Sequence, residues 1–297
     1  MQFYQEKGLA ACGLACPICR ESGCLGCAAK GCEDADTCGI YACVQEKDIA
    51  GCWQCEAFPC DQGMFASLRL RAFVRYARLF GVERLLERLR INQEAGIVYH
   101  RADGLQGDYD ALGSEAEVMH MIEYGREGDP YANCPVLQTE HFTLRLVEET
   151  DARDLLSCYA DPASRTLMNE DYCLGGFNFD TEAQMLDCLR IWRQVYETRD
   201  FIRWAIVDKE TNCAVGTIEM FGGEMGVFRL DVASRFEKEP YLSELTGLTN
   251  TFHLLFATER IVTKVPHHAQ ARRAAFAALG YHQAQIEGRE HYLVHQL

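Results

Sequence analysis

The chain has 297 residues, of which 48% are hydrophobic, and a formal net charge of −15. That length accommodates two ordinary domains with a sizeable core, and the composition is that of a globular protein rather than a disordered one. The acidic excess argues against a surface that binds nucleic acid or anionic membranes as a whole, although it leaves room for a local basic patch.

The first residues and the hydropathy pattern indicate a cytoplasmic protein without a membrane partner. "MQFYQEKGLAACG" has no apolar segment behind a basic start, so we expect no signal peptide. No apolar run reaches the roughly 18 residues of a membrane span. Because the cytoplasm keeps thiols reduced, dense cysteines in such a protein indicate metal binding rather than disulfides.

Residues 1–62 form the first predicted region, a Cys-rich module with few residues that can build a core. The spacing C-x₂-C, which lets two sulfurs turn onto one ion, occurs in it three times. No histidine precedes His100, so the predicted metal ligands are all cysteine: Cys12, Cys16, Cys19, Cys24, Cys27, Cys32, Cys38, Cys43, Cys52, Cys55 and Cys60. Metal binding would supply the folding free energy that the small core cannot.

Several chemistries suit this pattern. Two Cys₄ zinc sites would leave three thiols over, sulfurs could instead bridge a multinuclear cluster, and C-x₂-C pairs also serve iron–sulfur centres. Disulfides are the alternative that the compartment disfavours. We expect two or more structural zinc ions, with no open catalytic position. Five further cysteines are expected as small buried apolar side chains: Cys134, Cys158, Cys173, Cys188 and Cys213.

The stretches "CGLACPIC", "GCLGC", "CGIYACVQEKDIAGCWQC" and "EAFPC" resemble an uncharacterised bacterial and archaeal Cys-rich family with a CGL-x-C-x₂-C start and an FPC end. The resemblance covers about residues 9–62 and includes nearly every cysteine. It implies a metal-binding module and little more, because that family has no established activity.

Residues 63–125 are predicted as a helical segment packed on this module, interrupted at Gly81 and with a last helix opened by a capping box of Ser114 and Glu117. Residues 69–90 contain seven arginines and two glutamates, which gives this stretch a local charge of +5. The arginines suit two roles. They can contact the phosphates of a nucleic acid, or they can offset the negative charge of zinc thiolates and of the acidic residues 101–130. We expect the structural role, and no nucleic-acid partner.

After a linker at residues 126–140, residues 141–297 change character. Alternating and helical patterns predict the order strand–helix–helix–strand–strand–strand–helix–strand–helix–strand–strand, with a single helix over 150–168. The predicted fold class is α+β: a mixed, mostly antiparallel sheet flanked by helices, preceded by the Cys-rich module and the helical segment.

This order, with "FTLRLVEETDARDLLSCYADPASRTLM", "WAIVDKETNCAVGTIEMF", "FRLDVAS" and "RRAAFAALGY", resembles the GCN5-related N-acetyltransferases over nearly all of 141–297. In that fold acetyl-CoA lies in a V-shaped opening between the fourth and fifth strands. The resemblance implies that the backbone of Leu230, Asp231 and Val232 faces the thioester and pantetheine. The pyrophosphate would lie over the N-terminus of a helix starting near Tyr241, where amides are unpaired.

The cofactor loop departs from the family pattern. "SRFEKEPYLSEL", residues 234–245, has no glycine, Pro240 lacks an amide donor, and Glu237 and Glu239 repel phosphates. The tyrosine that often serves as the acid falls at Phe276. We therefore expect weak acetyl-CoA binding, with the phosphates held by side chains: Arg235, Lys238, Arg272 and Arg273.

Acetylation of an amine needs a base, and Glu219 and Asp231 are the candidate catalytic residues, with His267 and His268 as further choices. The first hypothesis is an N-acetyltransferase acting on a small-molecule or peptide amine. The alternatives are a non-catalytic binding or sensor protein of the same fold, and a zinc-dependent nucleic-acid-associated protein. The sequence leaves open whether the domain turns over a substrate.

Overall fold

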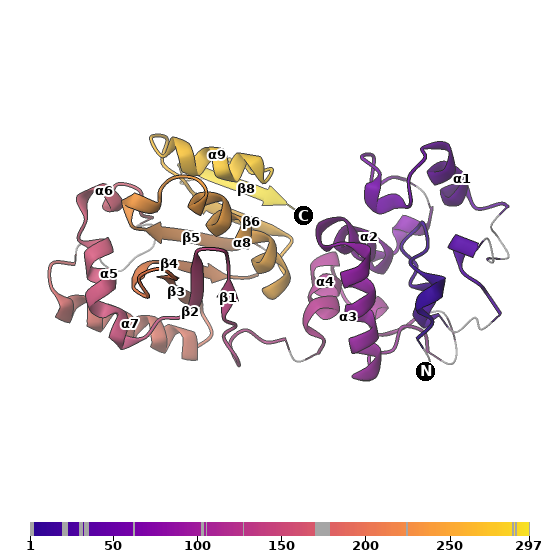
Figure 1. The fold of residues 1–297 in the computed structure, drawn as a ribbon, viewed down its shortest axis with the longest axis horizontal. Coiled ribbons are helices and arrows are strands. Elements are labelled where there is room, and N and C mark those ends of the chain that lie inside the picture. Colours follow the sequence, from indigo (N-terminus) through magenta and orange to yellow (C-terminus); the bar gives the residue numbers. More distant parts are fainter. Residues whose placement is uncertain are drawn as a thin grey trace. The chain divides into compact units, whose positions relative to one another are not determined.

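A computed structural model of the chain describes residues 3–296 except 20–22, 30–31, 33–35, 62, 102–103, 105, 127, 170–178, 224, 287 and 289. Contacts divide the chain into two compact units, Met1–Gly128 and Asp129–Leu297 (Figure 1). The boundary falls inside the stretch expected as a linker, and residues from Asp129 onward belong to the second unit. Among the described residues, no helix combines the length and apolar character that crossing a bilayer needs.

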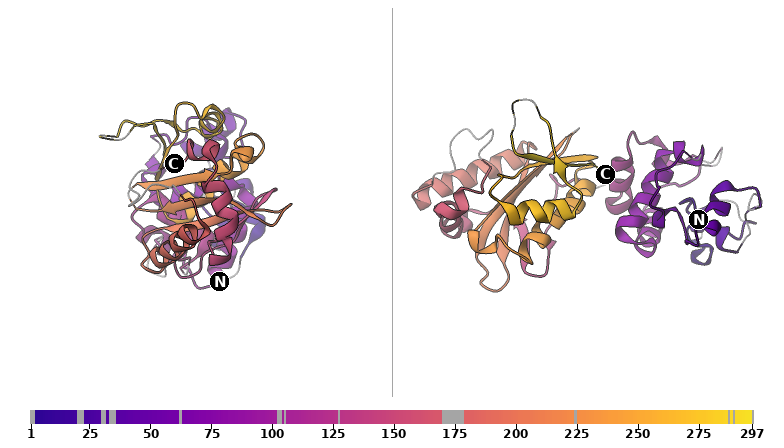
Figure 2. Two further views of the ribbon diagram at one scale, coloured as in Figure 1. Left: turned by 90° about the vertical axis from the view of Figure 1, so that its left-hand side faces the viewer. Right: turned by 90° about the horizontal axis from the view of Figure 1, so that it is seen from above.

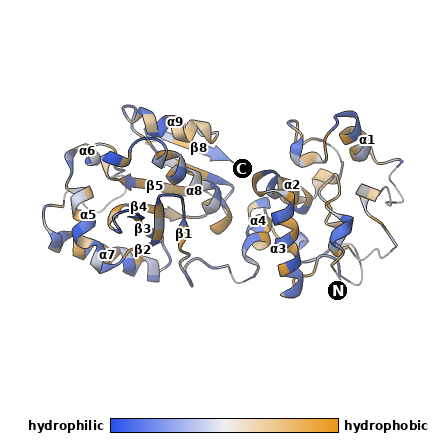
Figure 3. Ribbon diagram, viewed as in Figure 1, coloured by the Kyte–Doolittle hydropathy of each residue, from blue (hydrophilic) through white to orange (hydrophobic). Residues whose placement is uncertain are grey.

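The described residues of the first unit form short 3₁₀ turns and four α-helices: α1 (Gly39–Glu46), α2 (Leu68–Phe80), α3 (Val82–Glu94) and α4 (Glu115–Tyr124). Ser67 begins α2 by accepting a hydrogen bond from the amide of Leu70. Gly81, at φ +89°, separates α2 from α3, as the sequence predicted. Figure 3 shows hydrophobic and hydrophilic residues alternating along both helices, and the buried hydrophobic ones include Phe73, Val74, Leu85 and Leu89.

The last helix of the first unit has the predicted start with one difference. Ser114 Oγ accepts a hydrogen bond from the Glu117 amide at 3.1 Å, as a capping box requires. The Glu117 carboxylate, however, accepts from the amide of Gly113 at 2.7 Å. The reciprocal bond therefore reaches one residue further back than the sequence pattern implied.

The second unit contains an eight-stranded sheet in the order β1-β2-β3-β4-β5-β6-β8-β7. Its strands are β1 (Leu137–Gln138), β2 (Phe142–Leu146), β3 (Ile202–Asp208), β4 (Ala214–Phe221), β5 (Gly226–Val232), β6 (Arg260–Lys264), β7 (His282–Gln283) and β8 (Tyr292–Gln296). Of the strand pairs, β5–β6 is parallel and the others are antiparallel. The predicted α+β class with a mixed, mostly antiparallel sheet is confirmed.

Helices cover both faces of this sheet (Figures 1 and 2). They are α5 (Ala152–Tyr159), α6 (Pro162–Arg165), α7 (Glu182–Glu197), α8 (Tyr241–Leu255) and α9 (Gln270–Ala278). Tyr159 and Trp192, of α5 and α7, share a core with Ala205 of β3. On the other face Phe252 of α8 packs against Trp204, with their ring centres 5.1 Å apart, because residues 204 and 205 point to opposite sides of a strand.

One helix predicted from the sequence is two separate helices in the structure. The sequence pattern predicted continuity over 150–168, but α5 ends at Tyr159 and α6 begins at Pro162. Pro162 has no amide to continue the ladder, and Asp161 accepts hydrogen bonds from the amides of Ala163 and Ser164. The Asp-Pro pair therefore starts a new helix instead of extending the old one.

Gly216 on β4 lies where no side chain fits. A Cβ there would meet the carbonyl oxygen of Asp231 at 2.2 Å, and that atom belongs to the backbone of the paired strand. We expect Gly216→Ala to lower the free energy of unfolding of the second unit by about 1–3 kcal/mol, because the strands must separate. Urea denaturation measures it. Gly247→Ala on α8, where nothing lies within 4 Å, is the control and should stabilise by up to about 1 kcal/mol; equal effects would contradict the argument.

Candidate functional site: the opening between two strands

The sheet of the second unit opens between β5 and β6. The two strands pair at Gly226 with Ile261 and at Val227 with Val262, and at no later described residue. On its other edge β5 pairs with β4 as far as Val232. Beyond Val227 the strand therefore stays in the sheet on one side and leaves an opening on the other, where the resemblance implied the cofactor.

Arg272 of α9 fills part of this opening. Its Nη1 donates to the carbonyl of Leu230 at 2.7 Å and to that of Leu167 at 3.1 Å. Its Nε and Nη2 donate to the carboxylate of Glu237, in the loop after β5. Arg272 is 2% exposed, so a predicted phosphate ligand is instead an internal clamp that joins β5, the cofactor loop and the segment after α6.

The loop between β5 and α8 uses many of its own amides. A 3₁₀ turn spans Ser234–Phe236, and the amides of Phe236, Glu237 and Lys238 donate to backbone carbonyls of residues 233–236. At the start of α8, the amides of Leu242 and Glu244 donate to carbonyls of residues 238 and 240. These amides are therefore not directed at an anion in this conformation, although the helix starts at Tyr241 as expected.

The other predicted phosphate ligands, which neighbour the clamp in sequence, contact other groups or are exposed. Arg235 and Lys238 are exposed, and the Arg235 guanidinium lies 4.8 Å from the ring centre of Phe236. Arg273 donates to the carbonyl of Val265 and to Gln283. The sequence grouped these residues with Arg272, but the structure gives each a different neighbourhood.

Both candidate catalytic acids belong to a buried ionic cluster on the face of the sheet covered by α5 and α7. Glu219 of β4 accepts a hydrogen bond from Arg203 and forms an ion pair with Arg229, at 3.2 Å. Asp231 of β5 lies 3.4 Å from Arg203. Glu219 and Asp231 are 2% and 0% exposed. The two acids and two arginines balance in charge, as burial demands.

Neutral groups complete the environment of Asp231. The Tyr159 hydroxyl lies 3.3 Å from the Asp231 carboxylate and 2.7 Å from Thr217 Oγ1. The backbone amide of Asn169 donates to the Asp231 carboxylate at 3.4 Å. Burial raises the pKa of Asp231 above its ordinary value, although Arg203 acts in the opposite direction. Burial also raises the pKa of Tyr159 far above its usual range. Asp231 is thus a stronger base than a solvated aspartate.

The remaining sequence candidates are less suited to catalysis. His268 Nε2 lies 3.1 Å from the carbonyl oxygen of Thr166. The ring of His267 packs against that of His291, with ring centres 4.4 Å apart. Both histidines are exposed. Phe276, where a tyrosine would supply an acid, is fully buried against Phe228.

The cysteines of the first unit form two groups of neighbouring thiols. In one, a hydrogen bond between Cys16 and Cys27 raises the pKa of Cys16 and lowers that of Cys27 to about 6. Cys12 lies near Cys27 and Cys38 in the same group. Residues 20–22, 30–31 and 33–35, which interrupt this stretch, lie outside the described residues.

In the second group, Cys52 lies near Cys43, Cys55 and Cys60. Among the five scattered cysteines expected to be buried, Cys158 is buried, while Cys134, Cys188 and Cys213 are partly exposed. Cys173 lies outside the described residues.

The structure adds a histidine that the sequence did not connect with the module. His100 Nδ1 lies 3.9 Å from Cys19 Sγ, and His100 is 4% exposed. The two residues are 81 positions apart, so no local spacing could have revealed the contact. A thiol beside an imidazole nitrogen is a combination that zinc accepts.

The seven arginines of α2 and α3 all have partners within the first unit. Arg71 and Arg75 bind Glu115, and Arg84 and Arg88 bind Glu123. Arg69 binds Asp110, and Arg90 binds Glu94. Arg78 donates to the backbone carbonyls of Cys52, Trp53 and Cys55. Acidic residues, mostly beyond residue 101, and backbone carbonyls of the cysteine turn therefore bind the arginines that a nucleic acid would need.

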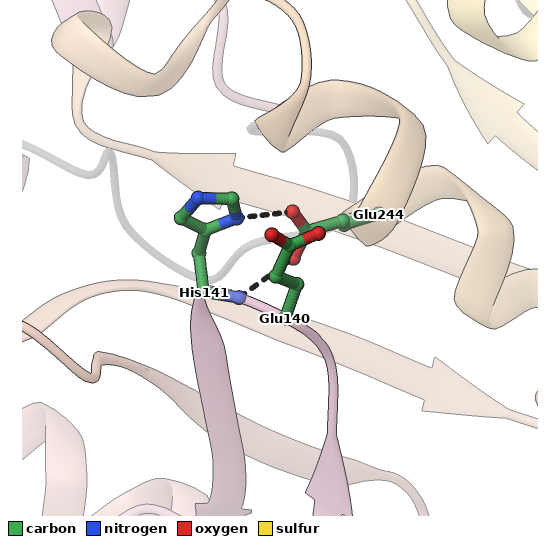
Figure 4. Close-up of side chains that lie close together, drawn as sticks. All are labelled: Glu140, His141 and Glu244. Atoms are coloured by element: carbon green, nitrogen blue, oxygen red, sulfur yellow. Dashed lines mark hydrogen bonds and ion pairs between the residues drawn. The ribbon is translucent and has the colours of Figure 1, made fainter.

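Three groups that metals accept lie within 4.8 Å of one another: Glu140, His141 and Glu244, the one such set of three among the described residues (Figure 4). The His141 ring already pairs with Glu244, and the His141 amide donates to the same carboxylate at 3.0 Å. The arrangement is therefore an ion pair that ties the β1–β2 turn to the first turn of α8.

Comparisons with known proteins find similarity in two separate parts of the chain. A family model described as "Protein of unknown function (DUF3795)" matches residues 19–64, most of the Cys-rich module. No curated protein matches the sequence. Solved structures similar to the C-terminal half include acetyltransferases. One, of the GNAT family, is from Bacillus anthracis (15% identity, 55% of this chain, 98% of that chain, TM-score 0.43).

Two further similar structures cover 55% of this chain. One is an acetyltransferase from Agrobacterium tumefaciens (18% identity, 93% of that chain, TM-score 0.43). The other is a ribosomal L7/L12 alpha-N-protein acetyltransferase in complex with coenzyme A (12% identity, 98% of that chain, TM-score 0.44). The acetyltransferase-type fold rests on the strand order and on the opening at the parallel pair described above.

The pair of His141 and Glu244 predicts a pH-dependent stability. The hydrogen bond to Glu244 raises the pKa of His141. Burial acts to raise the pKa of Glu244, but Thr139 and His141 lower it on balance. The pair therefore stabilises between the lowered and the raised pKa, and its contribution is lost as the pH rises through the pKa of His141.

We expect His141→Gln to lower the melting temperature at about pH 6 and to have little effect at about pH 9. Thermal unfolding followed by circular dichroism checks this. His268→Gln, at an exposed histidine on one backbone carbonyl, should show no such difference. The same loss for His141→Gln at both pH values would contradict the ion pair.

Proposed function

We propose that the second unit is an N-acetyltransferase that takes acetyl-CoA as donor and a primary amine of a small molecule or peptide as acceptor, with low affinity for the donor. The observation that carries the proposal is the opening between β5 and β6, at which the Leu230 carbonyl lies one residue from the buried Asp231. In the family that the sequence resembles, this strand binds pantetheine and the thioester.

The low affinity follows from the Arg272 clamp. A donor that uses the backbone of Leu230 has to displace a guanidinium with hydrogen bonds to two carbonyls and a carboxylate. Breaking two such bonds without full replacement costs about 3 kcal/mol, which lowers the apparent affinity roughly a hundredfold. Glu239, in the same loop, adds repulsion to a pyrophosphate.

Asp231 is the residue that we assign as the base. An amine attacks the thioester carbonyl only after its ammonium loses a proton, and the departing thiolate needs a proton in turn. Asp231 has a raised pKa, a neutral partner in Tyr159 and a single arginine, Arg203, at 3.4 Å. Glu219 is less suited, because two arginines hold its carboxylate.

A second candidate function is a non-catalytic binding domain, and the burial of both acids favours it. A carboxylate that is 0% exposed and paired with Arg203 serves the fold whether or not it serves a reaction. Binding of an acyl-CoA without turnover would then be the function of the opening. The two candidates differ in whether an acceptor amine becomes acetylated.

For the Cys-rich module we propose a structural role supported by two or more zinc ions. Its thiols lie in two groups, and the module has a small apolar core around Ile40, Val44 and Phe58. Tetrahedral thiolate coordination would stabilise such a small module. Because the arginines of α2 and α3 are engaged within the unit, nucleic acid is not part of the proposal.

The clamp predicts the outcome of calorimetric titration with acetyl-CoA. We expect weak binding to the unmodified chain. The double variant Arg272→Ala with Glu237→Ala, which removes both charges together, should bind at least tenfold more tightly, since part of the displacement cost disappears. Arg273→Ala is the matched control on the same helix and should change nothing. Micromolar binding by the unmodified chain, or no gain in a folded double variant, would refute the clamp.

If Asp231 is the base, a substitution there changes the rate of acetylation and leaves the affinity for acetyl-CoA unchanged. Asp231→Asn keeps the shape and much of the hydrogen bonding but cannot accept a proton at neutral pH. We expect it to reduce acetylation of a peptide amine by about a hundredfold or more, with acetyl-CoA affinity unchanged. Mass spectrometry of the peptide is the measurement, because the protein's own thiols interfere with thiol reagents. Equal rates for both proteins would exclude Asp231, and no acetylation by either would favour the binding domain.

A further inference from the structure

Four cysteines of the first unit surround one small cavity. Cys43 lies on α1, Cys52 and Cys55 flank the 3₁₀ turn Cys52–Gln54, and Cys60 follows shortly after. The cavity has a volume of about 30 Å³, and apolar side chains including Phe58 and Phe65 complete its lining. All four cysteines lie in the continuously described stretch 36–61.

The cavity, with a volume of about 30 Å³, has room for a single ion. Four sulfurs around one ion is the tetrahedral arrangement that zinc prefers.

The backbone around the thiols is already fixed by contacts that do not involve sulfur. The Cys55 amide donates to the carbonyl of Cys52 at 3.1 Å, and the Cys52 amide donates to that of Ala11 at 2.9 Å. Arg78 of α2 donates to the carbonyls of Cys52, Trp53 and Cys55. The C-x₂-C turn is therefore held in place by α2.

The charge around the cavity also suits an anionic centre. One divalent ion with four thiolates carries a net charge of −2. Lys47 Nζ donates to Cys55 Sγ at 3.3 Å. Together with Arg78, it places two positive charges beside the thiols, which offsets that charge.

We propose that Cys43, Cys52, Cys55 and Cys60 bind one zinc ion as a four-thiolate site of their own, separate from the other seven cysteines of the module. This assignment rests on the proposed zinc binding of the module. Within the described part of the chain no three thiols lie within 4.8 Å of one another, so binding rotates the cysteine side chains toward the cavity until each sulfur is about 2.3 Å from the ion. The four thiols release their protons to solvent as the thiolates bind.

The test is metal stoichiometry in the full chain, purified without oxygen and measured by plasma mass spectrometry. Cys52→Ser with Cys55→Ser should lose one zinc per chain, and so should Cys43→Ser with Cys60→Ser. The quadruple variant should also lose one, not two, because all four thiols serve one ion. The control, Cys134→Ser with Cys213→Ser in the second unit, should keep all the zinc.

A second measurement on the unmodified chain avoids the risk that a variant fails to fold. A chelator is added stepwise, and alkylated cysteines are mapped by mass spectrometry. We expect Cys43, Cys52, Cys55 and Cys60 to become reactive together, in step with the loss of one zinc. Alkylation of these thiols at different steps, or a loss of two ions from the quadruple variant, would overturn the assignment.

These outcomes separate the assignment from the proposal on which it rests. A chain without bound metal would refute both the zinc-binding module and this site. Full zinc content in both pair variants would leave the module standing and refute the four-thiolate site. Iron in place of zinc, lost in the same one-ion steps, would refute the identity of the ion.

Discussion

Where β5 leaves β6, the carbonyl of Leu230 loses the partner that a continuing ladder would provide. A buried carbonyl without a donor is costly, so some group has to replace the missing strand. In the family that the sequence resembles, that group is the pantetheine of acetyl-CoA. Here Arg272 takes the same place and brings Glu237 and Leu167 with it. The positions of the cofactor loop and of Leu167 depend on this one guanidinium, and under the proposed function the affinity for a donor does too.

The opposite face of β5 is under a second constraint. Two acids and two arginines are buried between the sheet and the helices α5 and α7, and the guanidinium of Arg203 lies 4.1 Å from the ring centre of Trp192. Removing one member of such a cluster leaves a charge uncompensated and costs more than the pair contributes. Asp231 is therefore both a candidate base and a structural residue, and a substitution that keeps its shape is the one that can separate the two roles.

Patterns along the chain predicted the strands from β2 onward and most helices, because a strand pattern repeats every two residues and a helix pattern every three or four. The two-residue strand β1 lies in the stretch expected as a linker. The break at Pro162 was missed since the apolar periodicity continues across it. The clamp joins residues 35 positions apart, and Cys19 and His100 are 81 apart. The sequence identified Arg272 as a basic residue near the opening, but only the packing of α9 shows that Glu237 already binds it. Local spacing likewise indicated metal ligands without sorting the cysteines into groups.

In the first unit, ion pairs between exposed side chains contribute little of the stability. Its arginines bind acids across α2, α3 and α4, and several of these pairs are half exposed, as with Arg84 and Arg90. Exposed pairs contribute little to stability, since water screens them and long side chains lose entropy in forming them. They orient α2 without supplying the free energy that a small apolar core lacks. Arg78 then fixes the cysteine turn against that helix, so an ion bound by the turn would stabilise both the module and the helices beside it.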